Sequence, residues 1–194
     1  MKIKLLLISL FISSVSFGQG NFYDNKMALE STYSFSPVNN GTGLAGVTVH
    51  FKKNIEVGVS FLGTPGATGA GVGLGFHAKK DQKLFYPSVF VSFYDVSIRG
   101  GGSSIIFTGN GVLNYRVLNL ETVKSEIFAG IGFASGIATN EHNTNASTSS
   151  VAFGIQAGIE IKKLTLRAGI GQSFSQSGNS VGSTTVSFGI GVLI

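Results

Sequence analysis

The chain has 194 residues, 43% of them hydrophobic and 12% charged, with 28 glycines, 3 prolines and no cysteine. This length fits a single domain, the hydrophobic content excludes a disordered chain, and the lack of cysteine excludes a disulfide-supported fold. The net charge of +5 falls to +3 without Lys2 and Lys4 (12 basic against 9 acidic residues), and no basic stripe with interleaved aromatics points to nucleic acid.

The first 18 residues are predicted to be a secretory signal peptide. Lys2 and Lys4 precede an apolar run from Leu5 to Ile12, and small residues then flank Phe17 in a pattern that a signal peptidase reads. The run is too short to span a membrane as a retained anchor. We therefore expect the mature protein to begin at Gln19 and residues 19–194 to form one domain.

Ten segments of the mature chain alternate between apolar and small or polar residues. Each is long enough to cross a bilayer as a tilted strand, whereas no apolar run of 18 or more residues could cross it as a helix. The fifth segment contains Pro87, which cannot donate to a strand ladder, so we expect that strand to begin near Ser88. The ten segments span residues 27–36, 44–52, 55–63, 70–79, 84–94, 105–117, 126–137, 151–162, 164–174 and 184–194.

The two faces of these segments differ sharply in chemistry. In residues 151–162, for example, one face is wholly apolar, and the other carries Gly154, Gln156, Gly158, Glu160 and Lys162. The second face is too small and too polar to be the outside of a water-soluble sandwich or lipocalin-like barrel. The pattern therefore predicts an all-β fold: an antiparallel, up-and-down transmembrane β-barrel of about ten strands, with eight as the alternative.

The predicted connections are of two kinds. Those after even-numbered strands are short and rich in lysine, at residues 53–54, 79–83, 118–125 and 162–163. Those after odd-numbered strands are longer and rich in Ser, Thr, Asn and Gly, at residues 37–43, 63–69, 95–104, 138–150 and 175–183. Short turns at one end and long loops at the other are typical of outer-membrane barrels, with the short turns in the periplasm.

The last strand carries a further signal. Its final residues, Ser187-Phe188-Gly189-Ile190-Gly191-Val192-Leu193-Ile194, resemble the terminal signal of bacterial outer-membrane β-barrels, although the family usually ends in Phe where this chain has Ile194. With the ten-segment pattern, residues 27–194 resemble the small outer-membrane β-barrel family of Gram-negative bacteria, which includes porin-like and OmpA-like transmembrane barrels.

The resemblance implies a location in the outer membrane after Sec-type export. It also implies contact with outer-membrane lipids and lipopolysaccharide, and with the barrel-assembly machinery during insertion. The roles that it leaves open are a porin-like channel for small solutes, a membrane-stabilising protein, a surface binding or adhesion module, and a component of a larger envelope complex.

Charged residues on the polar face are the candidate functional residues. Six near the turn ends are predicted to form a charge network in the lumen, which either rigidifies the floor of the barrel or gates it, below a glycine-lined, water-filled vestibule. The six are Glu30, Glu56, Arg116, Glu126, Glu160 and Arg167. The same face carries His50, Lys52, His77, Lys79 and Lys162.

The sequence offers no strong motif for catalysis or for a cofactor. Glycines such as Gly71, Gly73 and Gly75 recur every second residue within a strand, so they are not a phosphate-binding loop. The histidines His50, His77 and His142 show no close spacing to a serine or to metal ligands. A lipid-modifying outer-membrane enzyme is therefore the less favoured interpretation, and no catalytic, cofactor-binding or metal-ligating residue is predicted.

Overall fold

The structure is a computed structural model that describes residues 27–36, 39–51, 54–78, 84–139, 145–175 and 182–194. The predicted signal peptide lies outside these residues. Within them the chain forms ten strands: β1 (Met27–Ser36), β2 (Asn39–Phe51), β3 (Ile55–Thr64), β4 (Ala67–His77), β5 (Phe85–Ile98), β6 (Ser103–Asn119), β7 (Val123–Thr139), β8 (Asn145–Ile161), β9 (Leu164–Ser175) and β10 (Ser183–Leu193).

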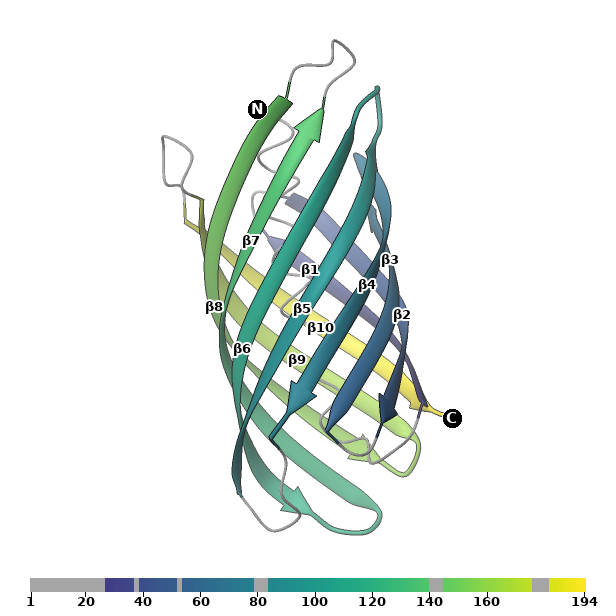
Figure 1. The fold of residues 1–194 in the computed structure, drawn as a ribbon. Coiled ribbons are helices and arrows are strands. Elements are labelled where there is room, and N and C mark those ends of the chain that lie inside the picture. The colour runs from purple at the N-terminus through teal and green to yellow at the C-terminus, as the bar shows by residue number, and fades with distance from the viewer. Residues whose placement is uncertain (1–26, 37–38, 52–53, 79–83, 140–144, 176–181) are drawn as a thin grey trace.

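The ten strands form one closed antiparallel barrel, in which each strand pairs with its neighbours in the chain and β1 pairs with β10 (Figure 1). The predicted up-and-down barrel of about ten strands is therefore confirmed, and the eight-strand alternative is wrong. No helix within the described ranges has the length and apolar character needed to cross a membrane.

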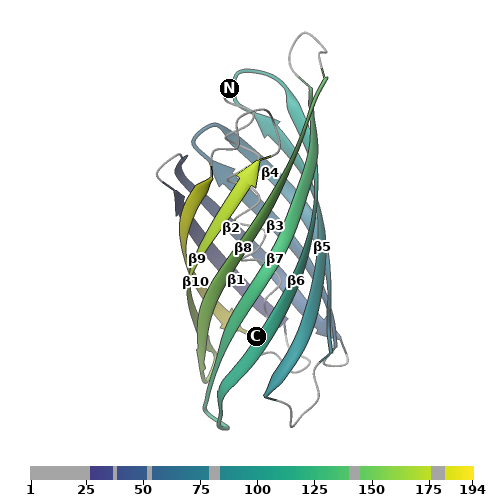
Figure 2. The same cartoon turned by 90° about the vertical axis from the view of Figure 1, so that its left-hand side faces the viewer.

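Closure of the barrel staggers the strands. The pairing register from Glu30 on β1 reaches Gly136 on β7 in one direction and Lys124 on β7 in the other. These two residues are 12 positions apart (136 minus 124), so one circuit shifts the register by 12 residues. Such a stagger requires the strands to tilt, as Figures 1 and 2 show.

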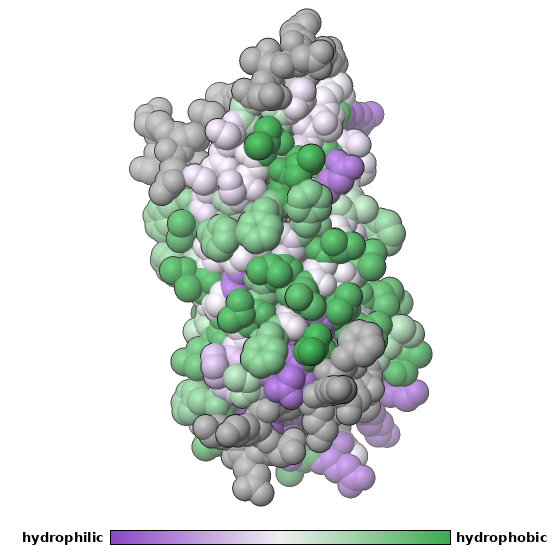
Figure 3. Space-filling model, in the orientation of Figure 1, coloured by the Kyte–Doolittle hydropathy of each residue, from purple (hydrophilic) through white to green (hydrophobic). Residues whose placement is uncertain are grey.

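The burial pattern is that of a barrel with an apolar exterior. Along β3 and β10, exposed apolar side chains alternate with buried polar or small ones in the register that the sequence predicts. Apolar residues form a broad band around the middle of the molecule, and hydrophilic residues gather toward its lower end (Figure 3). Because large apolar side chains outside and serine, threonine and charged side chains inside would be unfavourable in water, this surface suits a lipid environment.

Aromatic rings lie at both margins of the apolar band. Phe85 and Tyr115 stack at the turn end, the end where β1 begins and β10 finishes, with ring centroids 4.6 Å apart. Phe153 and Phe174 stack toward the opposite, loop end, with centroids 6.0 Å apart. Aromatic residues favour the boundary between headgroups and hydrocarbon, so the rings are placed to mark the two interfaces.

Several strands are longer than predicted, and the connections are correspondingly shorter. The loop expected at residues 63–69 is a turn at residues 65–66, because β3 and β4 continue to Thr64 and Ala67. The loop expected at residues 95–104 shrinks to residues 99–102, where three successive glycines adopt positive φ angles that non-glycine residues rarely adopt. The connection expected at residues 118–125 shrinks to residues 120–122. Alternation weakens near the ends of strands, where serines and lysines replace apolar residues on the outer face, although backbone pairing continues.

The prediction that the fifth strand begins near Ser88 is wrong, because β5 begins at Phe85 and includes Pro87. Pro87 accepts a hydrogen bond from the N–H of Ala78, which lies just beyond the end of β4. The missing N–H of the proline therefore faces the margin of the sheet, where a strand tolerates proline.

The inward glycines of β4 do not leave open space, contrary to the expectation that they widen the lumen. The ring of Tyr94 on β5 lies over Gly71, and the ring of Phe90 lies over Gly75, where a Cβ atom would be 2.7 Å from the ring. Larger side chains from the neighbouring strand thus lie flat against the wall where a glycine allows it. Only the row of Gly130, Gly154 and Gly171, which pair across β7, β8 and β9, has mainly backbone atoms as its nearest neighbours.

We expect Gly71→Ala to destabilise the barrel by about 1–3 kcal/mol, because the new methyl group would overlap the Tyr94 ring and lie 2.8 Å from the carbonyl oxygen of Phe93. The matched control is Gly111→Ala on the outer face, where no atom lies within 4 Å of the added Cβ. Denaturant unfolding in lipid vesicles measures both. An unchanged midpoint for Gly71→Ala would show that Tyr94 does not need this seat.

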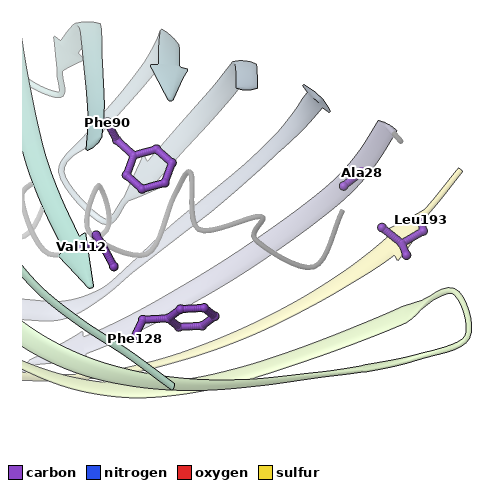
Figure 4. Close-up of a cluster of buried hydrophobic side chains, with 5 residues drawn as sticks. All are labelled: Ala28, Phe90, Val112, Phe128 and Leu193. Atoms are coloured by element: carbon purple, nitrogen blue, oxygen red, sulfur yellow. The ribbon is translucent and has the colours of Figure 1, made fainter. Parts of the chain in front are cut away.

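Buried apolar side chains fill part of the lower interior. Phe90, Val112 and Phe128 point inward from β5, β6 and β7, whereas Ala28 and Leu193 lie together at the adjoining ends of β1 and β10 (Figure 4). The lower lumen is therefore partly packed with side chains, as expected for barrels of this size.

Candidate functional site: the charged floor of the lumen

The predicted charged residues converge on the inner wall near the turn end of the barrel. All six side chains are buried, although charged residues are rarely buried unless they are paired. They come from β1, β3, β6, β7, β8 and β9, so the tilted strands bring together residues that are far apart in the chain.

The first part of this set is a corner between β5, β6 and β7. Arg116 Nε donates to Glu126 Oε1 at 3.2 Å, and the hydroxyl of Tyr86 donates to the other carboxylate oxygen at 2.6 Å. The guanidinium carbon of Arg116 also lies 5.6 Å from the centre of the Tyr86 ring, within range of a cation–π contact. The carboxylate is therefore held by a cation and a hydroxyl at once.

A hydrogen-bonded chain continues from this corner across β6, β5, β4 and β3. The Asn114 amide donates to the backbone carbonyl of Tyr86 at 3.0 Å and to Ser88 Oγ at 2.8 Å. Ser88 Oγ lies 2.9 Å from His77 Nδ1, and His77 Nε2 lies 3.0 Å from Glu56 Oε2. Five adjacent strands are thus linked through side chains as well as through the ladder.

The remaining charges close the opposite side. Arg167 on β9 contacts Glu30 on β1 at 2.8 Å, and the pair reaches across β10 at Gly191, where an added Cβ would lie 2.9 Å from Glu30 Cγ. Lys124 and Glu160 form a longer pair at 4.0 Å between β7 and β8. We call the residues of these contacts the floor network: Glu30, Glu56, His77, Tyr86, Ser88, Asn114, Arg116, Lys124, Glu126, Glu160 and Arg167.

The sequence missed some members of the floor network. Tyr86 was not recognised because its strand was expected to begin after Pro87, although alternation continued back from Ser88 would have placed Tyr86 inside. Ser88 and Asn114 were assigned to the inner face but not to the network, because a face assignment does not name cross-strand partners. Lys162 was expected on the inner wall but is an exposed turn residue with φ of 56°. The side chains of His50, Lys52 and Lys79 lie outside the described residues, as does His142.

Ser88, His77 and Glu56 together have the composition of a hydrolase relay, which sequence spacing alone did not reveal. However, the ring faces the carboxylate with Nε2 and the serine with Nδ1, the reverse of the usual arrangement. Ser88 also lies in mid-strand, paired with His77 and Val112, so its surroundings are a strand ladder and not the turn that exposes a nucleophile. Among the described side chains, no group of three or more histidines or carboxylates could hold a metal ion.

The inner wall above the floor network differs in charge. In the described ranges, its side chains are hydroxyls, amides, glycines and a few apolar groups, without a charged residue. The lumen therefore has an uncharged upper section and a charged lower one.

The outer surface carries a shallow apolar depression of about 420 Å³ over β5, β6 and β7. It arises because Gly109 and Gly111 place no side chain between Val91 and Phe133. It lies on the face that would contact lipid, so it is not a lumen site.

Neither a family model nor a curated protein matches the chain. Among solved structures, it is similar to the N-terminal β-barrel domain of OprF from Pseudomonas aeruginosa (8% identity, TM-score 0.42, covering 88% of this chain and 98% of that one). It is also similar to the translocator domain of the autotransporter NalP from Neisseria meningitidis (9%, 0.42, 97% and 99%) and to the KdgM porin (7%, 0.44, 85% and 98%). With scores below 0.5, the argument for a membrane barrel comes from the topology and the burial pattern and not from these neighbours.

Proposed function

Starting from a chain that folds as a small, closed, up-and-down barrel of the outer-membrane type, we propose that it is a porin-like protein with a narrow lumen, closed at the turn end by the floor network. We further propose that it is exported by a Sec-type route and inserted by the barrel-assembly machinery. It would then contact outer-membrane lipids and lipopolysaccharide, with the loop end outside the cell and an uncharged, water-filled vestibule above the floor.

The observation that carries this proposal is the floor network itself. It draws buried side chains from β1 and from β3 to β9 into hydrogen bonds and ion pairs at one depth of the lumen. Breaking such a buried pair leaves an uncompensated charge, so the closed arrangement is favoured. Passage of solutes would require these contacts to rearrange, which favours rare or small openings.

We expect the unmodified protein to give rare or small openings in planar bilayers, and the double variant Glu30→Gln/Arg167→Ala to give more frequent or larger ones. The pair spans β9 to β1 across the glycine-containing β10, and changing both residues removes it without leaving a buried carboxylate unpaired. Single-channel recording measures the effect. The control is Arg99→Ala, an exposed arginine at the loop end, which should leave the openings unchanged.

Large, steady conductance of the unmodified protein would contradict a closed floor and favour an open porin. Silence of both proteins would contradict a solute channel. Native folding of each variant is checked by the different gel migration of heated and unheated barrels, so that a misfolded variant is not scored as a closed one.

A surface binding role is the second candidate. It is favoured by the loop end of β7 and β8, which continue together as far as the pair Thr139 and Asn145. The described pairing of β8 with β9 stops at Ser150, so this hairpin extends beyond its neighbour and presents a run of Ser, Thr and Asn. Silence in bilayers would make this role the preferred one.

The proposal assigns no catalysis to the chain. Ser88, His77 and Glu56 are explained as one section of the floor network, because Asn114 and the Tyr86–Glu126–Arg116 corner continue the same chain of contacts.

A further inference from the structure

The upper inner wall contains polar groups that are buried but have no hydrogen-bond partner in the described part of the chain. They are Ser34 Oγ, Tyr94 Oη, Thr108 Oγ1, both polar atoms of the Asn110 amide, and Thr185 Oγ1. Each of these residues is at most 5% exposed. Buried polar groups in folded proteins are nearly always hydrogen-bonded, so a cluster of exceptions requires a partner that the protein itself does not supply.

These groups form two sets on opposite walls. Tyr94, Thr108 and Asn110 belong to the neighbouring strands β5 and β6, whereas Ser34 and Thr185 belong to β1 and β10. In the barrel order, β5 is four strands from β1, and β6 is four strands from β10, so the two pairs of strands face each other across the lumen.

The two sets also lie at a similar depth. The pairing row from Tyr94 reaches Glu30 on β1 through four strand steps. Because the register shifts by 12 residues in ten strands, the same height on β1 is about five residues nearer the loop end, next to Ser34. Ser34 pairs with Ser187 on β10, and Thr185 is two positions further toward the loops.

Tyr94 adds a flat aromatic surface to this section. Its ring lies along the wall over Gly71, which pairs with Ser60, and its hydroxyl lies close to Ser60 and Ser92 without reaching hydrogen-bond geometry with either. One face of the ring is therefore directed away from the wall. Beside it, the Asn110 amide lies over Gly132 on β7 and is held against the wall in the same way.

We propose that this section of the lumen is a binding site for a neutral, polyhydroxylated solute such as a short oligosaccharide. Hydroxyls and an amide on opposite walls would bind hydroxyl groups that both donate and accept, and the face of Tyr94 would pack against the apolar face of a sugar ring. A charged solute would lose its hydration here without meeting a counter-charge, since the charged residues lie below in the floor network. This inference rests on the proposed vestibule and names its ligand class.

Calorimetric titration of the detergent-solubilised, full-length barrel with maltotriose tests the proposal, with hexagalacturonate as a charged comparison. The expected result is weak, saturable binding of maltotriose and no binding of the charged oligomer. Thr108→Val and Thr185→Val, which remove a hydroxyl at nearly constant volume, should each weaken binding roughly 3- to 10-fold, the loss of one hydrogen bond. Tyr94→Phe keeps the ring and should weaken binding by a similar factor.

The matched control is Thr184→Val, because Thr184 is adjacent to Thr185 but points to the exterior. Its affinity should equal that of the unmodified protein. Absence of maltotriose binding would overturn the proposal and leave water as the partner of these groups, as would an equal loss at Thr184 and Thr185 or preference for the charged oligomer. Because binding at equilibrium does not require conduction, binding without bilayer activity would refute only the channel, and conduction without binding would refute only this site.

Discussion

Methionine in place of Arg116 is expected to destabilise the barrel by about 3–5 kcal/mol, the usual cost of removing one partner from a buried ion pair. Arg116 is the cation beside Glu126, whose carboxylate is 2% exposed and is otherwise contacted by the Tyr86 hydroxyl. Methionine fills most of the same volume, so the loss reports the charge and not a cavity. Denaturant titration of the protein in lipid vesicles, followed by gel migration, measures the change in the free energy of unfolding.

Two further variants separate the pair from its surroundings. Adding Glu126→Gln to Arg116→Met should recover part of the loss, because the unpaired carboxylate is then replaced by a neutral amide. Arg99→Met, an exposed arginine at the loop end, should change stability by less than about 0.5 kcal/mol. If Arg116→Met behaved like Arg99→Met, the floor network would be hydrated and would not close the lumen.

Arginine at Ile155 is expected to cost about 2–4 kcal/mol, the range for a charge on the lipid face near the middle of a bilayer. Ile155 is 52% exposed in the apolar part of β8, two residues on the turn side of the aromatic Phe153. The same substitution at the adjacent Gln156 should cost less, because that side chain is 8% exposed and points into the lumen. The free energy of unfolding in vesicles is again the measured quantity.

The comparison of neighbouring positions tests the orientation of the whole sheet. Since strand side chains alternate, a shift of one residue would exchange the two results. Equal losses at Ile155 and Gln156 would mean that the exterior of β8 does not face lipid.

The two halves of the lumen suggest different roles for polar residues in one barrel. In the floor network, polar groups satisfy one another, so their contribution is closure. Above it, Thr108 and Thr185 are buried without partners in the described chain, so their contribution depends on a guest molecule. A single fold can thus combine a closed lower section with a receptive upper one.

The sequence by itself determined the number of strands, their antiparallel order and which face of each strand turns inward. It could do so because lipid outside and polar groups inside impose a period of two on every strand, and Phe188 and Ser187 show this as clearly as Ile155 and Gln156. The same alternation placed the six charged residues of the predicted network on the inner face and near the turn end.

Only the tertiary structure decided which inward residues meet. Partners such as His77 and Ser88, or Arg167 and Glu30, depend on the register and on the stagger of 12 residues, which closure of the barrel sets and alternation within one strand does not record. For the same reason, the sequence alone suggested open space at Gly71, whereas the neighbouring strand places Tyr94 there. The ends of the strands likewise depend on backbone pairing, which continues after the apolar pattern has stopped.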